Sequence, residues 1–450
     1  MGTTHLQRRQ DRRQFLRHAG AAAGAGFLPS VARLVADSKP ETRPKVAAIF
    51  TEFRHRSHAH VILENFLEPY LFNGKRTSPD MDVVSFYGDQ FPPGDMARDI
   101  AKAYKIPIYP TIAEALCLGG KKLAVDAVLS IGEHGNYPVN AKGQREYPRK
   151  RFFDEIVAVF QDSGRVVPVF NDKHLSYRWD WAKQMYDTAV SMKIPFMAGS
   201  SVPLAQRRPP LELPKEAKIV EAVSIHGGPF EVYDFHGLEE LQSLVEARLG
   251  GETGVSRVQF LAGKALWKAA DDGLWSPALA DAAMAAELGA GRPTLRELVQ
   301  KPPFSKVQPW GIFVTYRDGL RAIVLKVGEK STRWNFACRL TGEAHARATS
   351  FYMGPWQNRN LFKALAHAIQ IHFRQRQAPY PVERTLLATG ILAAAVDSRH
   401  QRGTTQGTSH LRISYKSRDF RALREMGASW KLITEDMPEP SGIKPGGHVP

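Results

Sequence analysis

The segment at residues 165–176, RVVPVFNDKHLS, contains the pattern that decides the fold prediction. Residues 166–170 form a mostly apolar run, and four polar residues, 171–174, follow it directly. An apolar run that stops at polar residues is typical of a buried strand. In open parallel sheets the ligand crevice lies outside the carboxyl ends of the strands. The segment therefore predicts a buried parallel strand with a functional site at its end, where Lys173 stands.

Strand-like and helix-like segments alternate through the first half of the chain. Predicted strands lie at 45–50, 81–87, 108–110, 125–131, 166–170 and 195–198. Helical patterns lie at 61–70, 96–104, 112–118, 151–161 and 179–192. This alternation predicts an α/β fold in which residues 44–205 form a Rossmann-like, doubly wound parallel sheet.

The pattern changes in the second half, where strands are longer and more widely spaced. Strands are predicted at 217–225, 255–263, 310–316, 321–327 and 349–352, and helices at 238–248, 277–288, 361–375 and 382–395. A chain of 450 residues is long enough for two domains. We therefore expect residues 206–430 to form an α+β domain with an open antiparallel sheet. The Pro- and Gly-rich tail, 436–450, is expected to be disordered.

The N-terminus has the features of a targeting segment. Arg12 and Arg13 precede a short Ala- and Gly-rich apolar run at 19–28, and small residues follow. This order predicts a twin-arginine (Tat) signal peptide at 1–36, with the Tat export machinery as a partner. The apolar run is too short for a membrane span, and none is expected in the mature protein. The predicted location is periplasmic or extracellular.

Charge and cysteine content exclude several classes of protein. The formal net charge is +16, but the basic residues are scattered, so we interpret it as surface charge and expect no nucleic-acid partner. The two cysteines, Cys117 and Cys338, are too few and too isolated for a disulfide framework or a Cys-based zinc site.

The turn after the first predicted strand, TEFRHRSHAH at 51–60, contains no glycine. A dinucleotide-binding turn needs G-x-G-x-x-G so that its backbone can approach the pyrophosphate. Side chains at the start of the next helix could hold an anion instead. Two alternatives are a zinc site made by the histidines of this turn and a solvated basic loop in a domain that has lost its cofactor. The candidate cofactor-binding residues of the turn are Arg54, His55, Ser57 and His58.

Further candidates stand at the ends of other predicted strands. Asp89 follows the second strand, where an acid can bind ribose hydroxyls, although a turn or helix-capping role fits equally well. Lys173 can polarise a carbonyl or alkoxide oxygen and move a proton, and the alternative is a surface salt bridge. The remaining candidate cofactor-binding residues are Glu133, His134 and Asp172.

A histidine and a glutamate stand three residues apart in the second half, within YDFHGLEEL. At this spacing His236 and Glu239 share a helix face, so they could supply a general acid–base group and its orienting partner. The alternative is a helix-capping arrangement in which Asp234 or His236 is the N-cap.

Three segments together resemble the Gfo/Idh/MocA family of glucose–fructose oxidoreductase, inositol dehydrogenase and their relatives. They are DAVLSIGEHGNYPVN at 126–140, VFNDKHLS at 169–176 and DFHGLEEL at 234–241. The resemblance implies a Rossmann domain, an open antiparallel sheet that commonly forms a subunit interface, and NAD- or NADP-dependent oxidation of a sugar or polyol hydroxyl. Lys173 would stabilise the reacting oxygen, His236 would accept the proton, and Glu239 would orient His236. The chain departs from the family pattern at the glycine turn, and at Asp172, His174 and Asp234, which replace Glu, Pro and Gly.

The leading prediction is therefore an exported NAD(P)-dependent oxidoreductase that acts on a sugar or polyol and could form a homo-oligomer. One alternative is a non-redox lyase, hydrolase or isomerase acting on a sugar, which could use a metal at His55, His58 and His134. The other alternative is a carbohydrate-binding protein without catalytic activity.

Overall fold

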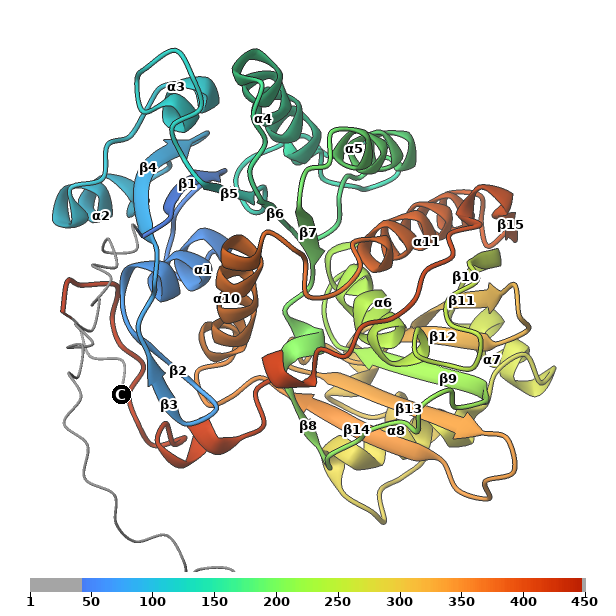
Figure 1. Ribbon diagram of the computed structural model, residues 1–450. Helices are drawn as coiled ribbons and strands as arrows, with labels where there is room; N and C mark the ends of the chain where they lie inside the picture. The colour runs from blue at the N-terminus through green and yellow to red at the C-terminus, as the bar shows by residue number, and fades with distance from the viewer. Residues whose placement is uncertain (1–42, 447–450) are drawn as a thin grey trace, which may run out of the picture. The chain divides into compact units, whose positions relative to one another are not determined.

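A computed structural model describes residues 43–446 (Figure 1). The predicted signal peptide, 1–36, and the last four residues lie outside this range. The first sheet has five parallel strands in the order β4-β1-β5-β6-β7. One parallel bridge between Phe86 and Ile108 stands where a sixth strand was predicted. Counting it, the order is that of a Rossmann-like sheet. The strands are β1 (Lys45–Phe50), β4 (Asp82–Gly88), β5 (Ala127–Ile131), β6 (Val169–Asp172) and β7 (Phe196–Gly199).

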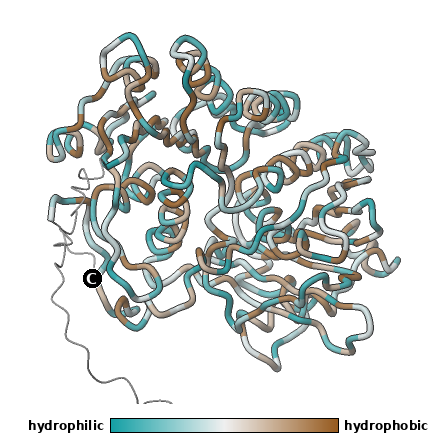
Figure 2. Tube along the Cα trace, in the orientation of Figure 1, coloured by the Kyte–Doolittle hydropathy of each residue, from teal (hydrophilic) through white to brown (hydrophobic). Residues whose placement is uncertain are grey.

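Helices cover both faces of this sheet, because residues of both faces of its strands are apolar. In β1, for example, Val46 and Ala48 face one core and Ala47 and Ile49 face the other. Apolar segments in Figure 2 accordingly gather along the strands and on the helix sides that meet them. The helices are α1 (His58–Leu67), α2 (Ala97–Tyr104), α3 (Ile112–Cys117), α4 (Arg149–Ser163) and α5 (Trp179–Ser191).

A late helix, α10 (Asn358–Gln375), packs beside α1 on the first sheet (Figure 1). The ring of Phe373 contacts Phe66 at 6.2 Å between centroids, and Gln370 Nε2 donates to the carbonyl of Asn65 at 2.9 Å. The range 206–430, expected to be a separate domain, thus contributes one helix to the first sheet.

The second sheet has eight strands in the order β15-β10-β11-β12-β9-β13-β14-β8. All neighbours are antiparallel except β12 and β9, which are parallel. The predicted fold class, a Rossmann-like parallel sheet followed by an α+β part with a mainly antiparallel sheet, is confirmed. The strands are β8 (Gln206–Arg208), β9 (Ile219–His226), β10 (Val255–Ala262), β11 (Trp310–Tyr316), β12 (Arg321–Lys326), β13 (Trp334–Leu340), β14 (Arg347–Tyr352) and β15 (Gln406–Gly407).

The second sheet carries helices on both faces. On one face α6 (Val232–Val245) lies so close to β12 that a Cβ on Gly237 would be 2.7 Å from Val324. On the other face alternate strand residues such as Val223 and Ile323 pack against Leu279 and Met284 of α8. This face is thus covered in part by the chain's own helices, and the expected subunit interface stays a prediction. The remaining helices are α7 (Lys264–Asp271), α8 (Pro277–Leu288), α9 (Leu295–Leu298) and α11 (Glu383–His400).

Several regions differ from the sequence prediction, among them β8, β13 and α7, which no predicted element covers. The helix predicted at 61–70 ends at Leu67, and a hairpin of β2 (Tyr70–Phe72) and β3 (Lys75–Thr77) follows. In the tail expected to be disordered, Glu439 pairs with Arg56 and Ile443 is buried, whereas most other residues of 436–446 are exposed. Within residues 43–446 no helix is long and apolar enough to cross a membrane. Short 3-10 turns lie at Val202–Leu204, Phe304–Lys306, Ser409–Leu411, Arg421–Leu423 and Ala428–Lys431.

Candidate functional site

Lys173 lies directly after β6, at the carboxyl end of the first sheet. Its φ of 63° is in the left-handed region, which is unusual for a residue other than glycine. The conformation is held by a hydrogen bond from its own N–H to the carbonyl of Gly199, at 3.3 Å. The turn directs the ammonium group toward β5, where Nζ lies 3.1 Å from Glu133 Oε1. Both side chains are only 3% exposed, so this is a buried ion pair.

Glu133 is shared by two cations. Arg149, at the start of α4, pairs with its second oxygen, and Thr51 Oγ1 donates to its backbone carbonyl at 2.5 Å. Burial alone would raise the pKa of Glu133, but Lys173 and Arg149 outweigh it and hold that pKa well below the usual value. Glu133 is therefore a carboxylate. Arg149 was not predicted, because it stands among other basic residues in PRKR and nothing local distinguishes it as the buried one.

His58 joins the same group of residues from the first turn of α1. Its Nδ1 lies 2.6 Å from Asp172 Oδ2, and its ring centroid lies 5.2 Å from that of His134. Burial lowers the pKa of His134 to about 4, so this ring is neutral at pH 7. The predicted residues Glu133, His134, Asp172 and Lys173 and the predicted His58 are thus brought together at the ends of β5 and β6.

His236 approaches this group from the second half of the chain. It lies in the first turn of α6, which begins with a capping box formed by Glu231 and Asp234. Its Nδ1 lies 2.5 Å from the hydroxyl of Ser200, which follows β7. Burial, reinforced by the nearby charges of Lys173 and His58, holds the pKa of His236 well below its usual value. The imidazole of His236 is therefore neutral at pH 7.

Glu239 does not make the contact expected of it. Ser200, rather than Glu239, contacts His236, and neither oxygen of Glu239 has a hydrogen-bond partner among residues 43–446. The carboxyl group lies over Gly199, where an added Cβ would be 2.9 Å from Oε2. Burial raises the pKa of Glu239 to about 7. The residue that contacts His236 is thus Ser200, whose position after β7 carried no motif, and the orienting role of Glu239 stays a prediction.

The first βα turn is filled by its own side chains. Phe53 is fully buried, and its backbone N–H and carbonyl bond to Asp95 Oδ2 and to the N–H of Met96, at 2.7 and 2.6 Å. Arg54 and His55 are half exposed and face the chain's own acids, Glu52 and Glu439. The hydroxyl of Ser57 caps α1. None of these three predicted residues lies with the Lys173 group.

Asp89, the predicted ribose ligand, is fully engaged within the protein. Its carboxylate accepts hydrogen bonds from Tyr87 and Tyr137, at 2.7 and 2.6 Å, and pairs with Arg151. The next residue, Gln90, exchanges two hydrogen bonds with the backbone of Asn136, at 3.0 and 2.9 Å. Because β1 lies between β4 and β5, these links pass across the carboxyl end of β1.

The residues present do not fit a nicotinamide dinucleotide. Its pyrophosphate needs a glycine turn after β1, whereas this turn buries Phe53 and is crossed by the links from Asp89 and Gln90. The same holds for a metal ion: among residues 43–446 no group of three His, Cys, Asp or Glu side chains is placed so that it could bind one. In particular, His55 and His58 point to different acids, Glu439 and Asp172.

Solved structures share this fold at low sequence identity. GenD2 from gentamicin A biosynthesis, in complex with NAD, has a TM-score of 0.50 and 12% identity over 85% of this chain and 100% of that one. A probable dehydrogenase from Thermotoga maritima and a myo-inositol dehydrogenase from Corynebacterium glutamicum each have a TM-score of 0.49 and 10% identity, over 82% of this chain and 99% of theirs. No protein-family model and no curated protein matches the sequence. The expected similarity to Gfo/Idh/MocA dehydrogenases is thus confirmed for the fold.

Proposed function

We propose that this chain is an enzyme that performs acid–base chemistry on a sugar or polyol, with Lys173 and His236 as its catalytic residues and without a bound nicotinamide dinucleotide. The reaction class would be that of a lyase, hydrolase or isomerase. One observation carries the proposal. Lys173 donates its backbone N–H to Gly199, the residue before the Ser200 that bonds to His236, whereas the turn that would hold a dinucleotide is closed by side chains.

The two residues have complementary roles. The Lys173 ammonium group stabilises negative charge that develops on a substrate oxygen, and its buried setting strengthens that interaction. When His236 donates its Nδ1 proton to Ser200, Nε2 carries the lone pair and accepts a proton from the substrate. Glu133, Arg149 and Ser200 are positioning residues in this scheme. Because Lys173 and His236 are only 3% and 7% exposed, we expect the surrounding segments to move when substrate enters.

A second candidate function is NAD(P)-dependent oxidation of the same class of substrate. The fold similarity to GenD2, whose structure contains NAD, favours it. This function would require the links between Asp89 and Tyr137 and between Gln90 and Asn136 to open. For either function we also propose export by the Tat pathway, supported by Arg12 and Arg13 at the N-terminus.

The deciding experiment measures nucleotide binding and turnover on the purified full chain. We expect no saturable binding of NAD or NADP up to about 1 mM, which corresponds to a binding free energy weaker than about −4 kcal/mol. A panel of sugars and polyols, followed by mass spectrometry, should reveal a product formed without nicotinamide reduction. Lys173→Met should abolish this turnover. Lys183→Met, which removes an exposed ion pair with Asp187, should leave it unchanged.

Two other results would overturn the proposal in different ways. Micromolar binding of NAD or NADP with nicotinamide reduction would establish the second candidate function. Sugar binding that Lys173→Met does not alter, with no product from any sugar, would establish a binding protein without catalytic activity.

A further inference from the structure

A cavity lies at the carboxyl end of α6, the end away from His236. Its volume is about 500 Å³, and it is lined by the carboxyl end of α6, the β8–β9 connection and the segment 416–424. His236 and Val245 are nine residues apart on α6, so roughly 14 Å along the helix separates the two places. Seven lysine and arginine residues line this cavity, against four acidic residues. The excess of positive charge favours an anionic occupant.

Two arginines in the cavity wall are buried without a full set of partners. Arg207 is 8% exposed and Arg424 is 2% exposed. They share one carboxylate, Glu212, which is itself 44% exposed and so largely hydrated. Among the described residues the Nε of each arginine has no hydrogen-bond partner. A buried N–H group without a partner costs about 1–3 kcal/mol, so the pair is incomplete in its present setting.

The nearby acids do not compensate this charge. Glu240 lies close to Arg207, but burial raises its pKa well above the usual value, which leaves the carboxyl group neutral. Glu246 is already paired with Arg384 and accepts a hydrogen bond from Tyr415. Burial and the charge of Arg424 accordingly lower the pKa of Arg207 to about 9, a sign that the site lacks negative charge.

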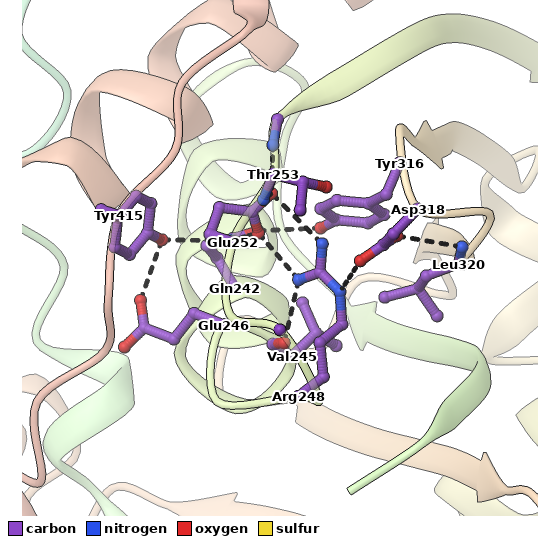
Figure 3. Close-up of polar contacts among 12 residues, drawn as sticks. Gln242, Val245, Glu246, Arg248, Glu252, Thr253, Tyr316, Asp318, Leu320 and Tyr415 are labelled. Atoms are coloured by element: carbon purple, nitrogen blue, oxygen red, sulfur yellow. Dashed lines mark hydrogen bonds and ion pairs between the residues drawn. The ribbon is translucent and has the colours of Figure 1, made fainter. Parts of the chain in front are cut away.

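Another arginine in the wall of this cavity, Arg248, has a full set of hydrogen-bond and ion-pair partners (Figure 3). Arg248 pairs with Glu252 at 2.9 Å and with Asp318 at 2.6 Å, and its Nη1 also donates to the carbonyl of Val245. Gln242 links Glu252 to Tyr415 and Tyr316. Because Arg248 is saturated by this network, only Arg207 and Arg424 remain as buried donors for a ligand.

We propose that this cavity binds a small molecule through a carboxylate or phosphate group, with Arg207 and Arg424 as the anion-binding pair. Guanidinium groups suit both oxyanions, because their N–H donors match paired oxygens. The volume lies within the range of small-molecule sites and exceeds the size of one oxyanion. The apolar side chains of Leu213, Leu244 and Phe420 would contact the rest of the ligand. Lys215, which is exposed, adds charge to the wall.

The test is calorimetric titration of the full chain with inorganic phosphate, D-glucuronate and D-glucose. We expect saturable binding of phosphate or glucuronate that Arg424→Lys weakens at least tenfold, because lysine keeps the charge but loses the fork of donors. Lys215→Met, a surface change that does not threaten folding, should weaken it about threefold through lost charge attraction. Arg296→Met on α9 removes an exposed ion pair with Asp271 of α7. This variant is the matched control and should bind both anions as tightly as the wild type.

The relative affinities identify the ligand group. Tighter binding of phosphate indicates a phosphate ester, and tighter binding of glucuronate indicates a sugar acid. The proposal is overturned if neither anion binds below about 10 mM, or if binding survives both Arg424→Lys and Lys215→Met. It is also overturned if Lys173→Met, rather than Arg424→Lys, removes the binding. This site is independent of the proposed function, so failure of either leaves the other standing.

Discussion

The carboxyl edge of the first sheet has two regions that differ in what they offer a ligand. At β4 and β1 the side chains of Asp89, Tyr137 and Gln90 are joined to each other or to backbone groups across the edge. At β6 and α6, by contrast, Lys173 and His236 are held in place by Glu133 and Ser200. The edge is thus closed by linked side chains at β4 and β1 (the closed region), whereas at β6 and α6 it carries buried ionisable groups (the Lys173 region).

The two regions are held together by different physical means. The closed region depends on hydrogen bonds to half-buried groups, whereas the Lys173 region depends on buried charges. Removing one partner of a buried charge costs far more than removing one neutral hydrogen bond. Substitutions in the two regions should therefore change the free energy of unfolding by different amounts and with a different dependence on pH.

The largest effect is expected from Arg149→Met in the Lys173 region. Arg149 is fully buried, pairs with Glu133 and lies 3.2 Å from His174 Nε2. Its loss leaves the Glu133 carboxylate with Lys173 alone, so we expect a loss of about 3 kcal/mol in the free energy of unfolding. Urea denaturation followed by circular dichroism measures this loss.

Arg165→Met is the matched control for this measurement. Arg165 pairs with Asp126, and both side chains are more than 40% exposed, so the expected loss is below about 1 kcal/mol. Equal losses in the two variants would mean that the Glu133 carboxylate does not depend on Arg149.

A smaller, pH-dependent effect is expected from Asp89→Asn in the closed region. Burial would raise the pKa of Asp89, but hydrogen bonds from Tyr137, Tyr87 and Arg151 outweigh it and lower that pKa. Its stabilising contribution is therefore complete above the unfolded pKa, near 3.9, and is lost as the pH falls through the lower folded value. We expect the variant to lose roughly 2 kcal/mol at pH 7 and progressively less below about pH 4.

Urea denaturation between pH 3 and pH 7 would follow this difference. Tyr137→Phe, which removes one donor but keeps the titrating carboxyl group, is the companion variant. A wild-type protein no more stable than Asp89→Asn at pH 7 would show that Asp89 is free for a ligand after all.

Much of the fold could be predicted because apolar periodicity is a local property of the sequence. The runs at 45–50 and 195–198 lie within one residue of β1 and β7. The hairpin of β2 and β3 was missed although Asn73-Gly74 carries its signal. Both residues have positive φ, 49° and 73°, as a two-residue hairpin turn requires. The helix predicted at 61–70 included Tyr70, the first residue of β2, so the turn that follows was not interpreted as a hairpin.

Several residues of the site were predictable because they stand at or just after a strand end. Lys173, Glu133 and Asp172 stand directly after or at the end of predicted strands, so topology alone brings them together. Arg149 and Ser200 were missed because their roles depend on contacts between distant segments. Sequence spacing likewise put Glu239 on the face of His236, but its carboxyl group lies over Gly199 instead.

An effect of the opposite sign, which separates Glu239 from the Lys173 region, is expected from Glu239→Gln. In the unfolded chain this carboxyl group ionises near pH 4.3, and in the folded chain burial raises its pKa to about 7. Between these values the folded chain binds the extra proton, so wild-type stability falls as the pH rises from about 4.3 to 7. Glutamine does not titrate and escapes this loss. We therefore expect Glu239→Gln to gain at least about 1 kcal/mol on the wild type between pH 5 and pH 8.

Urea denaturation at pH 5, 6, 7 and 8 measures that gain, with Glu343→Gln as the control, since Glu343 makes a part-exposed pair with Arg347. Ser200 already bonds to His236, so turnover on a sugar substrate should survive Glu239→Gln. A variant that instead loses stability above pH 7, together with turnover, would mean that an ionised Glu239 supports His236. The proposed acid–base site would then include Glu239 as well as His236. The first half of α6 would then carry two catalytic side chains, whereas its carboxyl end would carry only the proposed anion site.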